Sequence, residues 1–323
     1  MEKTILVTGA TGFIGHHLVS KLRPIYPLTL AVRNRQNCDD ANLRIVDIGD
    51  IDGETDWQEA LQGIDVVIHL AARAHQLNDT AVNPQQLFDS INTEGTKNLA
   101  QQSIRAGVKH FIFISSIGAM ATLSESILTD ESACQPDTPY GCSKLAAEKS
   151  LMELSQNSDM TWTILRPTLV YGPGNPGNMD RLMKLVKTGL PLPFGSFHNR
   201  RSFIYVGNLV DIILKAVSHP KAQNQTFLCS DGDDLSTTEL IQQIAKCADR
   251  RCSLLPVPLS LLRLGGGMLD ILQNLLGRSL SVNSETIARL MGSLWVDNSK
   301  LYSHLEWTPL YSIEEGLTQT FHE

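Results

Sequence analysis

Short apolar runs alternate with amphipathic or polar stretches along the first half of the chain. The runs span residues 5–7, 28–32, 43–46, 66–70, 111–115 and 161–165. Runs of this length predict β-strands, and the longer stretches between them predict helices and loops. The runs are continuously apolar rather than alternating, which is typical of parallel strands covered on both faces. The pattern therefore predicts an α/β fold with a doubly wound parallel sheet.

Three glycines follow the first apolar run at three-residue spacing, and a helical pattern follows them. Gly9 would allow a sharp turn, Gly12 a close approach to a pyrophosphate, and Gly15 the packing of the helix onto the strand. A glycine trio also occurs in ordinary strand–turn–helix units, but its place in the first element of the chain favours a nucleotide site. We therefore expect a Rossmann-type dinucleotide-binding unit. Its predicted cofactor contacts here are Gly9, Thr11, Gly12, Phe13, Ile14 and Gly15.

In a sheet of this kind the ligand lies beyond the carboxyl ends of the strands, so the residues that follow each run are informative. Arg33 follows the second run, where NAD-binding proteins usually carry an acidic residue for the ribose 2′-hydroxyl. An arginine suits a 2′-phosphate instead, although it could also be a solvated surface residue. NADP(H) is therefore favoured, and NAD(H) remains open. Further predicted cofactor contacts are Asp47, Ile48, Leu70, Ala71, Ala72 and Pro167.

Candidate catalytic residues follow the fifth run. Tyr140 and Lys144 are four residues apart, so on a helix they share a face. Transfer of a hydride to or from an alcohol carbon also requires a proton to move on the same oxygen. A tyrosine is a poor base at neutral pH, and an ammonium one turn away would favour the phenolate. Ser116, from the pair Ser115-Ser116, could donate a hydrogen bond to the substrate oxygen, and Lys144 could also hold the nicotinamide ribose.

Composition narrows the class of protein. A formal net charge of −7 and the lack of clustered Lys and Arg argue against a nucleic-acid partner. The apolar stretch 254–276 is interrupted by charged and polar residues and by three glycines, so it predicts no membrane span. The six cysteines form no C-x-x-C pair, and no metal-ligand spacing occurs. The chain enters a strand at once, without a signal peptide, and we expect a cytoplasmic protein.

The ordered motifs TGATGFIG, HLAA, SINTEGT, FISS, YGCSK and RPTLVYGPG resemble the extended short-chain dehydrogenase/reductases that act on nucleotide sugars. This resemblance covers nearly the whole chain and implies Ser116, Tyr140 and Lys144 as the catalytic residues. Where the family often has a tyrosine followed by glycine, this chain has Met120 and Ala121. The resemblance also implies a homodimer.

The later part of the chain is similar to a bacterial subgroup of UDP-glucose 4-epimerase-like proteins that includes 4-keto reductases. This similarity implies that Asn178 and Arg201 hold the phosphates of a UDP-sugar, together with Ser116 and Tyr140 on the sugar. Arg201 could grip a pyrophosphate bidentately, or it could be a surface residue. Asn92, in the motif SINTEGT, could tie a strand to a helix in the core; a structural role and a functional role are equally open.

The predicted organisation is an NAD(P)-binding domain over 1–170 and a smaller mixed α/β substrate domain over 171–323. Segments near 202–230 are expected to return to the first domain, and runs 191–194 and 256–276 to build the second. The predicted function is reduction of the C4 ketone of a UDP-4-keto-6-deoxy-N-acetylhexosamine with NADPH. The alternative is 4-epimerisation of a UDP-hexose or UDP-N-acetylglucosamine with tightly bound NAD.

Overall fold

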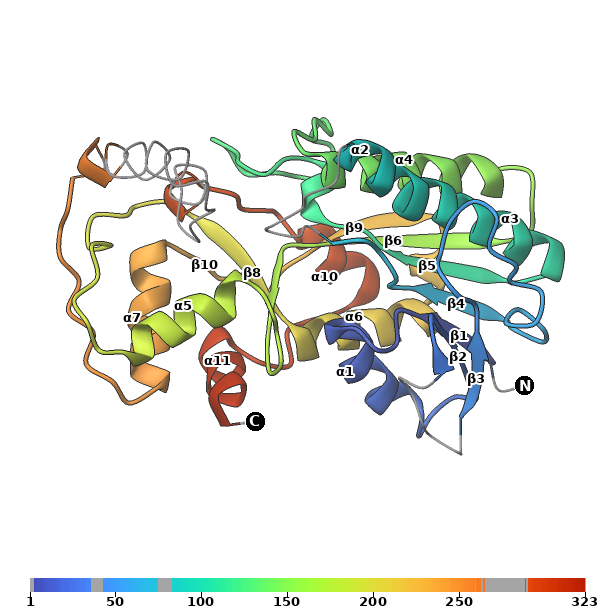
Figure 1. Ribbon diagram of the computed structural model, residues 1–323, viewed down its shortest axis with the longest axis horizontal. Coiled ribbons are helices and arrows are strands. Elements are labelled where there is room, and N and C mark those ends of the chain that lie inside the picture. Colours follow the sequence, from blue (N-terminus) through green and yellow to red (C-terminus); the bar gives the residue numbers. More distant parts are fainter. Residues whose placement is uncertain are drawn as a thin grey trace.

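A computed structural model describes residues 3–35, 43–74, 83–258, 260–262, 264, 288 and 290–322. Figure 1 shows two parts, a large parallel sheet covered by helices and a smaller part with a second sheet. The strands of the large sheet are β1 (Ile5–Thr8), β2 (Leu28–Val32), β3 (Arg44–Asp47), β4 (Val66–His69), β5 (His110–Ile114), β6 (Thr161–Pro167) and β9 (Gln225–Cys229).

All seven strands of the large sheet are parallel, in the order β3-β2-β1-β4-β5-β6-β9. The order reverses between β1 and β4, and such a switch point is where doubly wound sheets bind their ligands. The fold class predicted from the sequence is confirmed. The predicted strands match those of the structure to within two residues at each end.

Helices cover both faces of the large sheet (Figure 1). One face packs against α1 (Phe13–Leu22), α6 (Val206–Ser218) and α10 (Ser299–Leu305). The other face packs against α3 (Gly95–Ala106) and α4 (Pro139–Ser155). Before α3 come α2 (Pro84–Phe88) and a π-helical turn, η2 (Asp89–Glu94).

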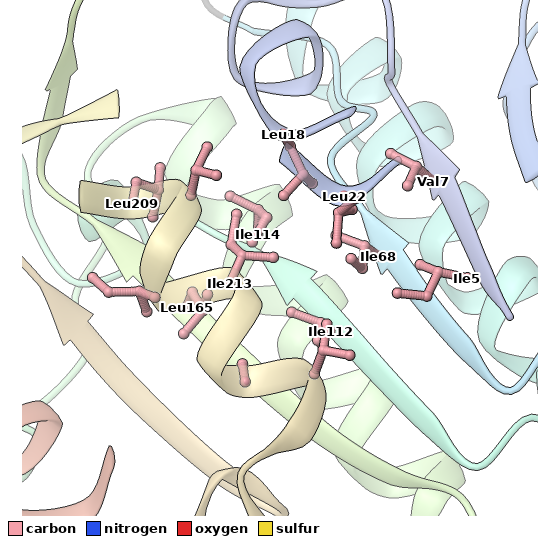
Figure 2. Packing of buried hydrophobic residues seen from close by; sticks show 14 of the residues in the cluster. Ile5, Val7, Leu18, Leu22, Ile68, Ile112, Ile114, Leu165, Leu209 and Ile213 are labelled. Carbon is pink, nitrogen blue, oxygen red and sulfur yellow. The ribbon is translucent and has the colours of Figure 1, made fainter. Parts of the chain in front are cut away.

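Side chains of β1 alternate between the two cores. Ile5 and Val7 pack toward Leu18 and Leu22 of α1, whereas Leu6 packs toward α3 and α4. Figure 2 shows the first of these cores, in which α1 and α6 lie over the strands. Both faces of the sheet are thus buried, which explains why the strands read as continuous apolar runs.

The smaller part is built around the sheet β10-β8-β7, formed by β7 (Leu169–Tyr171), β8 (Arg201–Tyr205) and β10 (Asp234–Leu235). The strand β8 is parallel to β7 and antiparallel to β10. The helices α5 (Asn178–Lys187), α7 (Thr237–Cys247) and α11 (Ile313–His322) pack on it in a separate core. Short 3-10 turns are η3 (Ile117–Ala119) and η4 (Pro220–Ala222).

The chain passes between the two parts several times, because α6 and β9 belong to the large sheet and β10 and α7 to the small one. Most of the run 256–276, expected in the substrate domain, lies outside the described residues. In the described part of the chain, no helix combines the length and apolar character needed to span a bilayer.

Candidate active site

The candidate cofactor residues meet at one edge of the large sheet. The parallel strands β1 to β6 end at Thr8, Val32, Asp47, His69, Ile114 and Pro167. The glycine turn, Arg33, Ile48 and the segment 70–72 directly follow these strand ends, while Asp47 and Pro167 are themselves the last strand residues. The structure therefore brings these residues to the carboxyl edge, where the sequence places the cofactor.

The glycine turn has the geometry that a bound diphosphate needs. Gly9 has a φ of 70°, and a Cβ there would lie 2.7 Å from the Ala71 nitrogen. A Cβ on Gly15 would lie 2.1 Å from the Gly9 oxygen, so only glycine lets α1 pack this close to the turn. Gly12 precedes α1, whose amino terminus has no side-chain cap. The first N–H groups of α1 are thus left for an anion, and the turn fits a dinucleotide.

A buried polar chain supports the segment after β4. His69 Nδ1 lies 2.7 Å from Thr8 Oγ1, and His69 Nε2 lies 3.0 Å from Thr96 Oγ1. Thr8 Oγ1 in turn accepts from the Ala71 N–H at 3.2 Å. Burial, together with the charge of Lys144, lowers the pKa of His69 to about 3, so the ring is neutral. His69 is part of the HLAA motif, but its role as a support was not predicted.

Arg33 lies on the surface and pairs with a carboxylate. Its Nε is 2.9 Å from Asp50 Oδ1, and the side chains are 77% and 83% exposed. Asp47 accepts hydrogen bonds from the backbone N–H groups of Arg35 and Gly49. The partner Asp50 was not identified from the sequence, because it follows a different strand.

Close packing fixes the start of α4. Thr138 caps the helix by accepting from the Gly141 N–H, and Pro139 occupies its first turn. A Cβ on Gly141 would lie 2.1 Å from the Gly118 oxygen, so the helix touches the turn that follows β5. The ring of Tyr140 lies against Gly118 and makes an edge contact with Phe88. Tyr140 and Lys144 therefore both lie on one helix, which begins at Pro139.

Tyr140 and Ser116 come together at this contact. Ser116 is half-buried, and its Oγ accepts from the Gly118 N–H at 3.0 Å. Burial raises the pKa of the half-buried Tyr140 phenol, and a hydrogen bond with Ser116 opposes this increase. Burial and Ser116 account for the shift in the pKa of Tyr140, and the predicted effect of Lys144 on Tyr140 stays a prediction.

Lys144 is buried and lies one turn after Tyr140 on α4. Its Nζ donates to the Ile114 carbonyl oxygen at 2.8 Å and lies 4.5 Å from the centre of the Phe113 ring. Burial lowers the pKa of Lys144 to about 7, and the negative charge of Glu148 opposes this shift. The ammonium thus titrates near neutral pH, in the range useful for acid–base chemistry.

Three supporting residues were missed in the sequence. Glu148 lies one turn beyond Lys144 and is paired bidentately with Arg166 of β6, at 3.0 Å from Nε and 2.6 Å from Nη2. Ser115 donates a hydrogen bond to the same carboxylate. The i, i+8 spacing from Tyr140 to Glu148 was a usable signal, but the spacing does not identify Arg166 as the partner.

Asn92 connects the segment after β4 to α4. It accepts from the Arg73 N–H at 2.8 Å, and its amide donates to the Arg73 oxygen and to Ser143 Oγ. Asn92 therefore has a structural role here, within the π-helical turn η2.

The two predicted phosphate ligands lie in the smaller part of the molecule. Asn178 is exposed at the start of α5, and Arg201 begins β8 and donates to the Gly292 oxygen at 3.3 Å. Both residues belong to the smaller part, whereas Tyr140 lies at the carboxyl edge of the large sheet, and their roles stay predictions. Among the described residues no cluster of metal ligands occurs, and all the described cysteines are free thiols.

Comparison with known proteins assigns the family. Residues 5–229 match the model of the NAD dependent epimerase/dehydratase family. The chain is 43% identical to a UDP-glucose 4-epimerase of Vibrio cholerae, over 99% of this chain and 95% of that protein. It is 29% identical, with the same coverage, to an N-acetyl-α-D-glucosaminyl-diphospho-ditrans,octacis-undecaprenol 4-epimerase of Escherichia coli O157:H7.

A solved structure agrees with the fold. The Bordetella bronchiseptica enzyme WbmG, in complex with NAD, superposes with a TM-score of 0.76 at 19% identity, covering 100% of this chain and 94% of that one. This likeness concerns the fold, whereas the family match extends over most of the chain. The protein is therefore a member of the NAD dependent epimerase/dehydratase family.

Proposed function

We propose that the protein is a 4-epimerase of a UDP-linked hexose or N-acetylhexosamine and uses NAD. The observation that carries this proposal is the contact of Tyr140 with Ser116, one turn of α4 before the buried Lys144, at the edge where the glycine turn lies. The 43% identity to a UDP-glucose 4-epimerase along nearly the whole chain favours epimerisation over the reduction expected from the sequence.

The chain's own residues would do the following. Bound NAD supplies a hydride acceptor and donor for C4 of the sugar. The Tyr140 oxygen takes the proton of the C4 hydroxyl and later returns it to the C4 oxygen, while the Ser116 hydroxyl holds this oxygen in place. The Lys144 ammonium favours the phenolate and holds the nicotinamide ribose. The proton and hydride removed are both returned, so the reaction needs no external reductant.

NAD is the proposed cofactor because the family is NAD dependent and because the Arg33 guanidinium is paired with Asp50. The 2′-phosphate of NADP would have to compete with that carboxylate. The glycine turn and the uncapped amino terminus of α1 would hold the diphosphate. A homodimer and a cytoplasmic location are part of the proposal; free cysteines throughout the described part of the chain suit a reducing compartment.

The carrier of the sugar is the point on which the two relatives differ, because one is named for a UDP-sugar and the other for a polyprenyl diphosphate. Both carriers present a sugar diphosphate. Asn178 and Arg201 are the residues that we propose for that diphosphate. UDP is preferred because the relative with the higher identity is named for it.

The test incubates the purified protein without added cofactor with UDP-glucose, UDP-N-acetylglucosamine and the undecaprenyl diphosphate-linked sugar. NMR of the products should reveal the C4 epimer of at least one UDP-sugar, at equilibrium with its substrate. Conversion of the lipid-linked sugar alone would show that the carrier is undecaprenyl diphosphate rather than UDP. Stoichiometric NADPH oxidation with a UDP-4-keto sugar, and no epimer in any other arm, would instead establish the reductase.

A further inference from the structure

We propose that Glu148 is a positioning residue for Tyr140 and Lys144: its carboxylate, bonded to Ser115 and Arg166, fixes the face of α4 that carries both residues and favours the ammonium form of Lys144. Tyr140, Lys144 and Glu148 recur every four positions of α4 and so lie on one face of the helix. Tyr140 is at the half-buried end of this row, whereas Lys144 and Glu148 are 2% and 0% exposed. This inference goes beyond the proposed function and rests on it only for the activity readout.

The carboxylate is held rigidly by two strands. Arg166 of β6 binds it with two hydrogen bonds, and Ser115 at the end of β5 donates a third. Bidentate guanidinium–carboxylate pairs fix orientation as well as charge. Since Lys144 also donates to the Ile114 carbonyl oxygen, α4 is tied to the end of β5 at two successive turns.

The adjacent residues Ser115 and Ser116 make contacts on opposite sides of the backbone. Ser115 is buried and bonds to Glu148, whereas Ser116 is half-buried and contacts Tyr140. Successive side chains of an extended segment point to opposite sides, and Ser116 has extended backbone angles. The bond of Ser115 to Glu148 therefore also fixes the backbone from which Ser116 reaches the site.

Charged and titratable groups lie near Lys144 on α4, β4 and β6. Glu148 and Tyr140 belong to its own helix, His69 faces it from β4, and Arg166 lies beyond Glu148 on β6. His69 is neutral, so Glu148 is the anion that acts on Lys144. Burial alone would favour the neutral amine. A neutral amine carries no charge with which to favour the phenolate that the proposed function assigns to Tyr140.

The test separates charge from packing with two variants of the full-length protein. Glu148→Gln keeps the size of the side chain and removes its charge, whereas Glu148→Asp keeps the charge and shortens the side chain. Carbon-13 NMR of lysine labelled at Cε, with the Lys144 signal assigned by its loss in Lys144→Arg, follows the titration directly. We expect Glu148→Gln to lower the pKa of Lys144 by about one to three units, and Glu148→Asp to leave it near the parent value.

Activity gives a second readout. The alkaline limb of the pH–kcat profile should shift to lower pH in Glu148→Gln, together with the pKa of Lys144, and should keep its position in Glu148→Asp. Glu153→Gln, at an exposed position of α4, is the control and should match the parent in both readouts. A parent without activity on any sugar diphosphate would reject the proposed function, but the NMR titration would still test Glu148.

Glu148→Gln leaves Arg166 buried without its carboxylate and is the variant most prone to unfolding. The double variant Glu148→Gln/Arg166→Gln removes both charges and avoids this problem. Lys144 should still titrate below the parent value in the double variant. An unchanged Lys144 titration in whichever of these two variants folds would reduce Glu148 to a structural residue and overturn the proposal.

Discussion

Two arginine–carboxylate pairs lie close to the carboxyl edge of the same parallel sheet, and they differ in their surroundings. In the pair of Arg166 with Glu148 the side chains are 9% and 0% exposed, and the contact is bidentate. In the pair of Arg33 with Asp50 they are 77% and 83% exposed, and one contact of 2.9 Å is made. The residue types are alike, so any difference between the two pairs in their effect on stability comes from their different exposure to solvent.

Exposure decides what each pair can do. Removing one partner of a buried pair strongly lowers the free energy of unfolding, because the remaining charge has no water to solvate it. An exposed pair contributes about 0–1 kcal/mol and is screened by salt. Glu148 and Arg166 can therefore hold α4 in place against β6, whereas Arg33 and Asp50 can only bias the choice between ligands.

The two pairs also serve different parts of the proposed reaction. Glu148 lies behind Tyr140 and Lys144, where the proton moves, and Arg33 lies where the adenosine ribose is expected. A change in one region should leave the other unaffected.

The largest effect is expected for Tyr140→Phe. Loss of the phenolic oxygen removes the proton acceptor, and kcat should fall by about 10² to 10⁴-fold in the epimerisation assay. NAD binding, measured by calorimetry, should stay at the parent value because the cofactor edge is intact.

The matched control for this variant is Tyr26→Phe, which removes a phenolic oxygen near the opposite edge of the sheet, between α1 and β2. It should retain parental kcat. Tyr140→Phe with parental kcat would exclude Tyr140 from the chemistry and leave the row on α4 without a catalytic purpose.

Arg166→Met tests the buried pair itself. Glu148 would keep its charge without a partner, and the free energy of unfolding should fall by about 3–5 kcal/mol in a urea titration. The double variant Arg166→Met/Glu148→Leu should recover most of this loss, because no buried charge is left. A loss below about 1 kcal/mol would place the buried pair in the same class as a surface pair.

The sequence predicted those features that local patterns encode. Continuous apolar runs located the strands, glycine spacing located the turn at Gly9, and the four-residue spacing of Tyr140 and Lys144 located the face of α4 that carries the candidate catalytic residues. These patterns arise within single elements, so they can be recognised before the chain is folded.

Partners from other elements could not be predicted in this way. Arg166 meets Glu148 because α4 packs against β6, and Asp50 meets Arg33 because β3 lies beside β2 in the sheet. The NADP preference was inferred from Arg33 alone and has no support from the comparisons, which fits an arginine whose charge is already paired.

The smallest effect is expected at the exposed pair. Asp50→Asn removes the carboxylate that competes with a 2′-phosphate for Arg33, so NADP should bind more tightly relative to NAD. An exposed contact worth up to about 1 kcal/mol corresponds to a change of about fivefold or less in the ratio of the dissociation constants. Titration of the cofactor-depleted protein with each dinucleotide measures this ratio, and the shift should shrink at high salt. Arg33→Ala should abolish the effect of Asp50→Asn in the double variant, because the carboxylate acts through the arginine. An equal shift with and without Arg33 would show that Asp50 repels the phosphate directly, and no shift in either background would remove the exposed pair from cofactor selection.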